Sequence, residues 1–449
     1  MTLENILNQI SGFIWGPLTL IFLLGVGVYL MLGLKGFPLK DLGYGFKSLF
    51  KKSKKDDLGD ISPFESLMTA LSATVGTGNI AGVATAIFLG GPGAIFWMWI
   101  TALFGMATKY AEAFLAVYFR EKNSKDNFVG GPMYYIKNGL QKKYHFLAYL
   151  FAFFGMIAAF GIGNGVQSNS VAQVLFIEFG ISQIVVGVII AILVALVILG
   201  GIESIGRTAS KLVPTMAGIY FLGGLFIIIN NISQLPDIFL LIINSAFTGT
   251  AASGGFAGAS VLVAIRFGVS RGIFSNEAGL GSSPIAHAAA KTNDPIKQGS
   301  ISMLEPLIDT LIICTITAFV ILIGDSWLSG VNGAALTASA FDQGLPFVGK
   351  YIVIFGLVLF AFSTIIGWSY YGEKCAEFIF GEKVTTTYRV LWIVAIPLGA
   401  TIKLNLVWLV ADIMNGLMAL PNLIALVLLS PLIFSKTKEF LNNRNKDTK

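Results

Sequence analysis

The chain has 449 residues, of which 55% are hydrophobic and only 12% are charged, and its formal net charge at pH 7 is +6. A soluble domain normally carries about 25% charged residues, and a surface with so few would expose large apolar patches to water. The composition therefore excludes an ordinary soluble protein and predicts an all-α integral membrane protein.

Apolar runs of about 20 residues, the length that crosses a hydrocarbon core as a helix, recur along the chain. The first run is too long for a signal peptide and has no basic residue before it, so we expect it to be retained. Pro421 interrupts the last run, which forms either one long helix or two short ones. We expect about eleven transmembrane helices, near residues 13–34, 64–89, 93–119, 147–178, 181–200, 211–230, 256–290, 301–324, 350–376, 387–402 and 405–434.

Lysine and arginine in the connecting loops set the expected orientation. Seven lysines lie between residues 35 and 55, and basic residues recur in the stretch 120–143 and in the tail 436–449. With alternating spans these stretches share one side, so we expect the N-terminus outside and the C-terminus in the cytoplasm. The lysine-rich stretch also suits contact with anionic lipid. On the outer side we expect the short apolar segment 236–247 and a long loop at 325–349.

Two of the expected spans are rich in glycine near their middle, at residues 72–82 (Ser-Ala-Thr-Val-Gly-Thr-Gly-Asn-Ile-Ala-Gly) and 274–284 (Phe-Ser-Asn-Glu-Ala-Gly-Leu-Gly-Ser-Ser-Pro). Each glycine weakens a helix by about 1 kcal/mol relative to alanine, so we predict local unwinding at both places. In hydrocarbon an unwound turn persists only where it lines a cavity. The amino ends of half-helices suit a carboxylate, and their carboxyl ends suit an ammonium group or Na⁺. Close packing of small residues is the alternative.

The position of the two glycine-rich spans predicts an internal repeat. If the first span is accessory, one glycine-rich span opens a ten-helix core and the other is the sixth helix of that core. Five is an odd number, so the two halves run in opposite directions across the membrane, as in an inverted repeat. The expected divisions are 1–60 (accessory helix and basic loop), 61–230 (first repeat), 231–435 (second repeat) and 436–449 (basic tail).

Residues 75–79 (Val-Gly-Thr-Gly-Asn) resemble the unwound first helix of LeuT-type transporters. The run 272–283, continued by 285–292, resembles the signature of the alanine or glycine:cation symporter family, as do residues 130–134 (Gly-Gly-Pro-Met-Tyr) and 254–258 (Gly-Gly-Phe-Ala-Gly). The resemblance implies a LeuT-type 5+5 inverted repeat with one extra N-terminal helix. It also implies Na⁺- or H⁺-coupled uptake of alanine or glycine across the cell membrane.

Candidate substrate-binding residues follow from the breaks and from this resemblance, which places Thr77, Gly78, Ser275, Asn276 and Gly279 around the charged ends of the amino acid. In the polar stretch 161–169 we expect Gln167 to contact the substrate, with close helix packing as an equal alternative. Phe274 and Trp368 are expected as pocket walls, with ordinary packing as the alternative. The full candidate set is Thr77, Gly78, Asn79, Gly165, Gln167, Phe274, Ser275, Asn276, Ala278, Gly279 and Trp368.

Ser363 and Thr364 lie mid-span, and LeuT-type transporters place such a hydroxyl pair in the eighth core helix. We therefore expect a Na⁺ site formed by these two residues with backbone carbonyls near Ser72 and Val75. Oxygen ligands suit a hard cation. The alternative is that both hydroxyls hydrogen-bond to the preceding helical turn.

Glu277 is an ionisable group within the membrane, which is functional by default and needs a partner. We expect it to hold the second break in shape, paired with Arg266 or Arg271, in preference to coupling protons. His287 is expected to be a packing residue. Pairing inside the bundle or a place near its interfaces is expected for Lys109, Glu112, Glu305, Asp309 and Asp412.

Other classes of function lack their signatures in the sequence. A channel would carry a repeated filter motif, and a membrane enzyme would need a nucleophile with its base, or a metal cluster. The two cysteines and two histidines have no metal-ligand spacing. We therefore expect no enzyme activity and no cofactor beyond Na⁺ as the coupling ion. The expected partners are a small neutral amino acid, Na⁺ or H⁺, and lipid, without nucleic acid. Another cation-coupled solute transporter of the same fold, or an ion channel, is the alternative.

Overall fold

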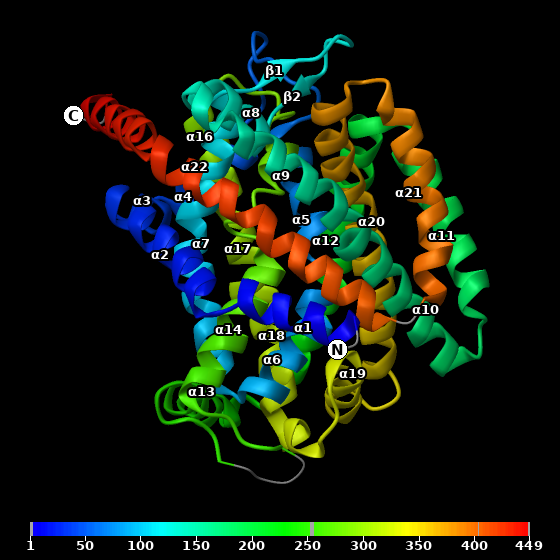
Figure 1. Ribbon diagram of the computed structural model, residues 1–449. Helices are drawn as coiled ribbons and strands as arrows, with labels where there is room; N and C mark the ends of the chain where they lie inside the picture. The colour runs from blue at the N-terminus through cyan, green and yellow to red at the C-terminus, as the bar shows by residue number, and fades with distance from the viewer. Residues whose placement is uncertain (1–2, 252–255, 403, 448–449) are drawn as a thin grey trace.

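The computed structural model describes residues 3–251, 256–402 and 404–447, which form a helical bundle (Figure 1). Up to residue 230 it contains α1 (Leu3–Ile14), α2 (Pro17–Gly33), α3 (Phe37–Lys40), α4 (Leu42–Leu49), α5 (Pro63–Thr74), η1 (Gly78–Gly82), α6 (Val83–Gly90), α7 (Gly93–Tyr118), the strands β1 (Glu121–Lys122) and β2 (Phe128–Val129), α8 (Pro132–Gly139), η2 (Lys142–Tyr144), α9 (His145–Ala158), η3 (Ala159–Gly165), α10 (Val166–Phe179), α11 (Gln183–Ile198) and α12 (Gly201–Asn230). The strands pair antiparallel, with Glu121 opposite Val129.

The rest of the chain contains η4 (Ile232–Gln234), α13 (Leu235–Thr248), α14 (Val261–Asn276), α15 (Pro284–His287), α16 (Pro295–Ser302), α17 (Leu304–Pro306), η5 (Leu307–Cys314), α18 (Thr315–Leu322), η6 (Ile323–Ser329), α19 (Gly333–Gly344), α20 (Gly349–Phe380), α21 (Val384–Thr401) and α22 (Leu404–Asp447). The segments η1, η3 and η5 are π-helical turns inside longer helices. Such turns often mark functional sites.

The prediction of a multi-pass membrane protein is confirmed. Within the described ranges, seven helices are long and apolar enough to cross a membrane, or eight if the bent pair α5 and η1–α6 counts as one span. Three of the eleven expected spans do not meet this measure: α11 and α14 have only 16 residues each, and α21, with 18 residues, is not among the seven. The last expected span is the single helix α22, with Pro421 inside it.

The helices differ in how deeply they lie in the bundle. In the most apolar window of α7, 83% of the residues are buried, against 33% in that of α12. Helix α7 is therefore central, whereas α12 leaves large apolar side chains such as Ile219, Leu222 and Phe226 exposed, as a lipid-facing helix does. Helix α20 packs between α12 and α9, α11 pairs with α21, and α22 crosses the outside of α9 obliquely (Figure 1).

Local sequence explains where the first broken helix starts. Ser62 Oγ accepts a hydrogen bond from the N–H of Glu65 (3.2 Å), and Glu65 Oε2 accepts one from the N–H of Ser62 (2.8 Å). Pro63 occupies the first helical position, where its missing N–H has no cost. This capping box fixes the start of α5 and hence the register of the glycines that follow.

The expectation of a long loop at residues 325–349 is wrong, because these residues contain the helix α19, in which Leu336 and Phe341 are fully buried. Thr337 Oγ1 donates a hydrogen bond to the carbonyl of Ile80 (3.0 Å). That carbonyl also accepts from the N–H of Val83, so α19 adds a second hydrogen bond to the π-helical turn η1.

Candidate substrate and ion site

The interruption predicted in the first glycine-rich span lies at residues 75–77, between α5 and η1. Helix α5 ends at Thr74, Val75 is extended (φ −75°, ψ 91°), and the two half-helices are bent by 52°. The N–H of Gly76 donates to Asn79 Oδ1 (2.9 Å), whereas a continuing helix would use a carbonyl one turn back. The Asn79 side chain thus ends the first half-helix and leaves carbonyl oxygens of its last turn for other partners.

The interruption predicted in the second glycine-rich span lies between the end of α14 and Pro284, where α15 begins. Glu277, Gly279 and Gly281 have positive φ angles of 56°, 90° and 82°. This conformation costs most residues about 1–2 kcal/mol but costs glycine nothing. The two glycines are therefore needed for the turn.

The two breaks touch each other. A Cβ atom at Gly78 would lie 3.4 Å from the ring of Phe274 and 3.4 Å from Cα of Ser275. The amino end of the half-helix η1–α6 therefore faces the last turn of α14. This contact brings candidate residues from both glycine-rich spans to one place.

A fully buried carboxylate, Asp309 on η5, connects the two breaks. Its Oδ1 accepts a hydrogen bond from Asn79 Nδ2 (2.6 Å), and its Oδ2 accepts from Ser275 Oγ (2.7 Å) and Thr310 Oγ1 (2.8 Å). Thr310 Oγ1 in turn accepts from Asn276 Nδ2 (3.1 Å). Asp309 thus holds candidate residues of both breaks, a role that the sequence did not predict because Asn79 is 230 residues away.

A cavity of about 210 Å³ lies beside the first break. Two buried oxygens near this break, Thr77 Oγ1 and Gln167 Oε1, have no hydrogen-bond partner within the described part of the chain. Leaving such an atom unpaired costs about 1–3 kcal/mol. Of the two oxygens, Thr77 Oγ1 belongs to a residue that lines the cavity, so a polar ligand there can satisfy it, whereas Gln167 is not part of the lining. The cavity is lined by Thr77, Ala81, Gly82, Thr85, Ser170, Arg271 and Phe274.

The candidate cation ligands lie where α20 passes the first break. A Cβ atom at Gly76 would lie only 2.6 Å from Thr364 Oγ1 and 3.7 Å from Gln167 Oε1. The hydroxyls of Ser363 and Thr364 both donate to the carbonyl of Phe360 (2.8 and 3.0 Å), which is the back-bonding alternative. A donating hydroxyl keeps its acceptor lone pairs, so these contacts leave both oxygens able to bind a cation.

The remaining candidate ion ligands also lie in the wall between α5 and α20. Ser72 Oγ donates to the carbonyl of Thr69 (2.7 Å). A Cβ atom at Gly367 of α20 would lie 2.7 Å from Ser72 Oγ. Val75 is fully buried at the break itself. The four candidates therefore lie along one contact between two helices.

Three substrate candidates face other parts of the bundle. Gly165 packs against Gly399 of α21, which is the packing alternative for this stretch. Ala278 lines a small space with Leu23 and Thr108. The carbonyl of Gly279 accepts from Asn422 Nδ2 (2.9 Å) on α22.

The motifs that carry the family resemblance also meet in space. Cβ atoms at Gly130 and Gly131 would lie 2.5 Å from Ala288 Cβ and 2.7 Å from Ile285 Cγ1. Residues 130–134 are therefore packed against residues 285–292, the end of the run that begins at residue 272. In the motif 254–258, residues 254 and 255 lie outside the described residues, and Phe256 is buried against Trp327.

Comparison with known proteins decides the family. The model of the sodium:alanine symporter family matches residues 1–449. The chain belongs to this family. It is 49% identical to the sodium/alanine symporter AgcS of Methanococcus maripaludis, with both chains covered completely. It is 38% identical to the probable sodium/glutamine symporter GlnT of Bacillus subtilis, over 98% of this chain and 91% of that one.

The family membership confirms that the protein is a cation-coupled amino-acid symporter and not an enzyme, with Na⁺ implied as the coupling ion. Among solved structures, the fold resembles that of a manganese transporter from Eremococcus coleocola, with a TM-score of 0.55 over 86% of this chain and 91% of the other. The two sequences are only 13% identical, so this likeness concerns the fold alone.

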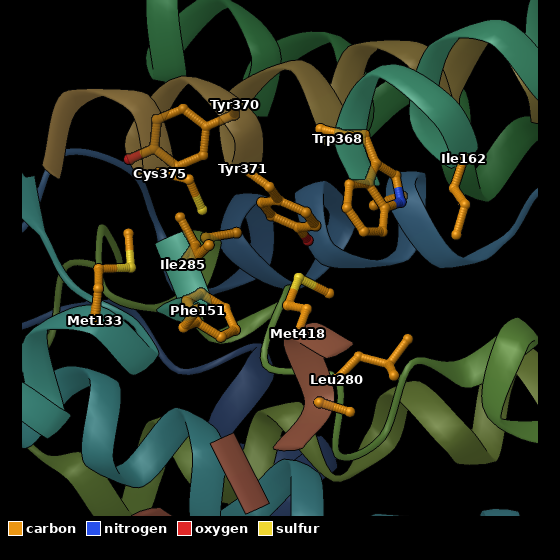
Figure 2. Close-up of a cluster of buried hydrophobic side chains, with 14 of the residues drawn as sticks. Met133, Phe151, Ile162, Leu280, Ile285, Trp368, Tyr370, Tyr371, Cys375 and Met418 are labelled. Carbon is orange, nitrogen blue, oxygen red and sulfur yellow. The ribbon is translucent and has the colours of Figure 1, made fainter. Parts of the chain in front are cut away.

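The expected pairing of Glu277 with Arg266 or Arg271 is wrong. Glu277 accepts hydrogen bonds from Trp368 Nε1 (2.9 Å) and from the hydroxyl of Ser282. The two arginines lie one or more turns earlier on α14, beside Phe267 and Phe274. Glu277 thus ties the second break to α20, and Trp368 is packed against Gly163 and buried near Ile162 and Tyr371 (Figure 2).

A buried network of charges surrounds α15 beyond the second break. Lys109 Nζ donates to Ser283 Oγ (2.7 Å) and to Glu305 Oε2 (2.8 Å), and both charged side chains are fully buried. His287 Nε2 lies 2.6 Å from Glu305 Oε1. Sequence alone predicted pairing within the bundle for Lys109 and Glu305, but not which partner each would have.

A second carboxylate, Glu112, holds the middle of the same break. Its Oε1 accepts from the N–H of Gly279 (3.1 Å) and from Asn422 Nδ2 (2.7 Å). Tyr135 donates its hydroxyl hydrogen to Asn422 Oδ1. The N–H and the carbonyl of Gly279, in the middle of the second break, are therefore both satisfied by side chains of the protein itself.

Proposed function

We propose that the chain couples inward Na⁺ movement to the uptake of a small neutral amino acid such as alanine or glycine, by alternating access. The fold behind this proposal is a LeuT-type repeat of five plus five helices with one accessory N-terminal helix, eleven spans in all. The N-terminus would lie outside and the C-terminus in the cytoplasm.

The proposal depends mainly on Thr77 Oγ1 in the cavity lining and on Gln167 Oε1 near Gly76, two buried oxygens with no partner among the described residues. An amino-acid ammonium group in the cavity would donate to Thr77 Oγ1, and to Gln167 Oε1 once that side chain reaches the cavity. Its carboxylate is attracted by the amino end of the half-helix that begins at Gly78. A zwitterion thus suits both kinds of group that the break leaves available.

Na⁺ would bind between the first break and α20, through Ser363, Thr364 and the carbonyl oxygens near Ser72 and Val75. Thr364 and Gln167 both approach Gly76, so the ion ligands and a substrate ligand share one turn of unwound backbone. Binding of Na⁺ would fix that turn in the conformation that the amino acid needs. By linkage, each ligand must then raise the affinity for the other by the same factor.

Access from outside would be controlled by Phe274 and Arg271. Both line the 210 Å³ cavity, and both also line a neighbouring cavity of about 110 Å³ with Ser11, Trp15, Arg266 and Asp412. The Arg271 guanidinium lies 5.8 Å from the centre of the Phe274 ring. Movement of this pair would join the two cavities.

The test is uptake of radiolabelled alanine into proteoliposomes under an inward Na⁺ gradient alone, an inward proton gradient alone, and neither. We expect accumulation with the Na⁺ gradient. Accumulation with the proton gradient alone would assign the coupling to protons, and uptake that ignores both gradients would refute symport.

Substrate size is tested by competition with unlabelled amino acids in the same vesicles. Alanine and glycine are expected to compete at similar concentrations. Glutamine, named for a relative that is 38% identical, is expected to need at least about tenfold more, since each extra methylene changes binding by about 1–3 kcal/mol. Equal competition by glutamine would show that Phe274 does not limit the size of the side chain.

A further inference from the structure

A larger cavity, of about 570 Å³, lies away from the proposed transport site, where α4 and the segment after it meet the start of α16 and the end of α22. We call it the basic cavity. Six basic side chains line it: Lys47, Lys51, Lys52, Lys54, Lys297 and Arg444.

The basic cavity carries more positive than negative charge, because three aspartates, Asp56, Asp57 and Asp294, line it beside the six basic side chains. Arg444 pairs with Asp41 (2.7 Å), but within the described residues no ion pair involves any of the five lysines. Two of the three aspartates accept hydrogen bonds from backbone N–H groups. Asp57 Oδ2 accepts from the N–H of Lys54 (2.7 Å), and Asp294 Oδ1 accepts from the N–H groups of Ile296 (2.9 Å) and Lys297 (3.1 Å).

Apolar side chains beside these lysines point to a lipid as the ligand. Helices α3 and α4 directly follow the first membrane helix, α2. Leu39 (40%) and Phe46 (40%) on them, and Phe50 (75%) directly after α4, are exposed. A short helix with lysines and exposed phenylalanines at the end of a span is typical of a segment that lies in the membrane interface. A soluble phosphate would use the lysines but would leave the phenylalanines uncovered.

We propose that the basic cavity binds the phosphate headgroup of an anionic phospholipid, with its acyl chains lying along Phe46 and Phe50. Lysines close to an anionic membrane surface each contribute about 1 kcal/mol. The site is separate from the substrate cavity and does not depend on the transported solute.

The position of the basic cavity connects it to both breaks. Ser53 Oγ donates to the carbonyl of Lys291 (2.8 Å), and the N–H of Thr292 donates to the carbonyl of Leu58 (2.9 Å). The segment before α5 is thus fixed to the segment after α15. A bound headgroup would strengthen this joint by bridging Lys51 and Lys54 to Lys297 on α16.

The binding test uses the detergent-solubilised full chain and counts bound lipids by native mass spectrometry. Phosphatidylglycerol, phosphatidylcholine and glycerol phosphate are the three probes. The double variant Lys51→Gln/Lys52→Gln is compared with Lys142→Gln/Lys143→Gln, a pair of neighbouring exposed lysines outside the basic cavity. We expect the first variant to bind phosphatidylglycerol about thirtyfold more weakly and the second to bind like wild type.

Equal binding of phosphatidylglycerol and phosphatidylcholine, or equal losses in the two variants, would overturn the proposal. Displacement of the lipid by glycerol phosphate at comparable concentration would assign the cavity to a soluble phosphate compound instead. If the double variant does not fold, the single variant Lys47→Gln serves, with a loss of about fivefold expected. Bound lipid is counted without transport, so a failure here is distinct from a failure of the proposed symport.

Discussion

Among the described residues, Thr77 and Gln167 at the first break keep buried oxygens without a partner, whereas at the second break the protein itself supplies partners for Glu277, Gly279 and Ser283, and only Glu112 Oε2 beside it lacks one. The surroundings differ too. The first break lies beside a cavity. Leu280 of the second break is buried in an apolar cluster between α9, α20 and α22 (Figure 2).

This difference indicates a division of roles between two segments that have similar glycine-rich sequences. Polar groups that await a ligand lower stability in its absence and contribute to binding. Polar groups that the protein satisfies contribute to folding and hold a shape. Substitutions at the first break should therefore change transport more than stability, and those at the second break should do the reverse.

The largest expected effect comes from breaking the buried pair at the second break. Lys109→Met leaves Glu305 as a buried charge without its lysine, and removal of one partner of such a pair costs about 3–5 kcal/mol. We expect a large fall in the yield and thermal unfolding temperature of the purified protein, measured by fluorescence-detected size exclusion after heating.

Lys137→Met is the matched control for this prediction. Lys137 pairs with Glu121 at 3.0 Å, but the side chains are 45% and 36% exposed, and such pairs contribute at most about 1 kcal/mol. Similar losses in both variants would mean that burial of the pair is not what matters. A stable Lys109→Met variant with defective uptake would place Lys109 in transport and would contradict the division of roles.

A second pair of variants compares the stability effect of one glycine from each break. Gly281→Ala forces a side chain to φ 82°, which costs about 1–2 kcal/mol, and its Cβ would lie 2.6 Å from Pro132 Cγ. At Gly78 a Cβ meets nothing closer than 3.4 Å. We expect Gly281→Ala to lower the unfolding temperature and Gly78→Ala to leave it near wild type. The reverse order would show that the second break rearranges freely.

Much of the architecture could be predicted from sequence because its signals are local. Glycine pairs at 76/78 and 279/281 predicted both interruptions, since helix propensity depends on neighbouring residues. The helix α19 was missed because it is amphipathic, short, and lies in a segment with loop-like polar residues. Contacts with residues distant in the sequence stabilise this helix: it packs on α20, and Thr337 donates a hydrogen bond to the carbonyl of Ile80.

Only part of the site could be predicted, because only some of its residues carry a local signal in the sequence. Thr77 and Gln167 were candidates because they stand in glycine-rich stretches. Asp309 had no local signal that would connect it to Asn79 or Ser275, and a carboxylate alone does not reveal its partners. The arginine pairing for Glu277 failed because sequence proximity favoured Arg271, whereas the fold brought Trp368, 91 residues away, into contact.

Asp309→Asn tests the group that joins the two breaks. Asp309 accepts from three side chains, and an asparagine has only one acceptor oxygen, so at least one donor loses its partner. Hydrogen bonds to charged groups contribute about 1.5–3 kcal/mol, so alanine KM should rise about tenfold or more. Asp342→Asn, at an exposed position on α19, is the control. An unchanged KM would remove Asp309 from the site.

Thr77→Val tests the first break alone. Valine keeps the shape and removes a hydroxyl that has no protein partner, so stability should not fall. Loss of one hydrogen bond to the substrate, about 0.5–1.5 kcal/mol, should raise alanine KM by about two- to tenfold. Thr85→Val is the control, because Thr85 lines the same cavity but donates to the carbonyl of Ala81. Equal KM values in the two variants would count against Thr77 as a ligand.

The smallest effect is expected at Asp60, outside the membrane, where the segments adjoining the two breaks meet. The N–H groups of Asp60 and Ile61 both donate to the carbonyl of Ala289 (2.8 and 3.2 Å), and Asp60 Oδ2 accepts from the N–H of Phe128 (2.9 Å). Partial burial raises the pKa of Asp60. A raised pKa favours the folded state at low pH, and this contribution is lost as the pH rises through the folded pKa.

Asp60→Asn should therefore stabilise the protein at neutral pH, and the gain should disappear in acid, because asparagine is uncharged and its oxygen can still accept from Phe128. Since the carboxyl is only half-buried and solvent screens it, we expect a gain within about 0.5 kcal/mol. Thermal unfolding between about pH 4 and pH 8 measures it, with alanine uptake recorded at neutral pH. Unchanged uptake would show that this joint only supports the breaks. Faster or slower uptake at constant stability would mean that the contact of Asp60 and Ile61 with Ala289 changes during transport. The proposed division of roles between the two breaks would then have to assign a transport role to this contact as well.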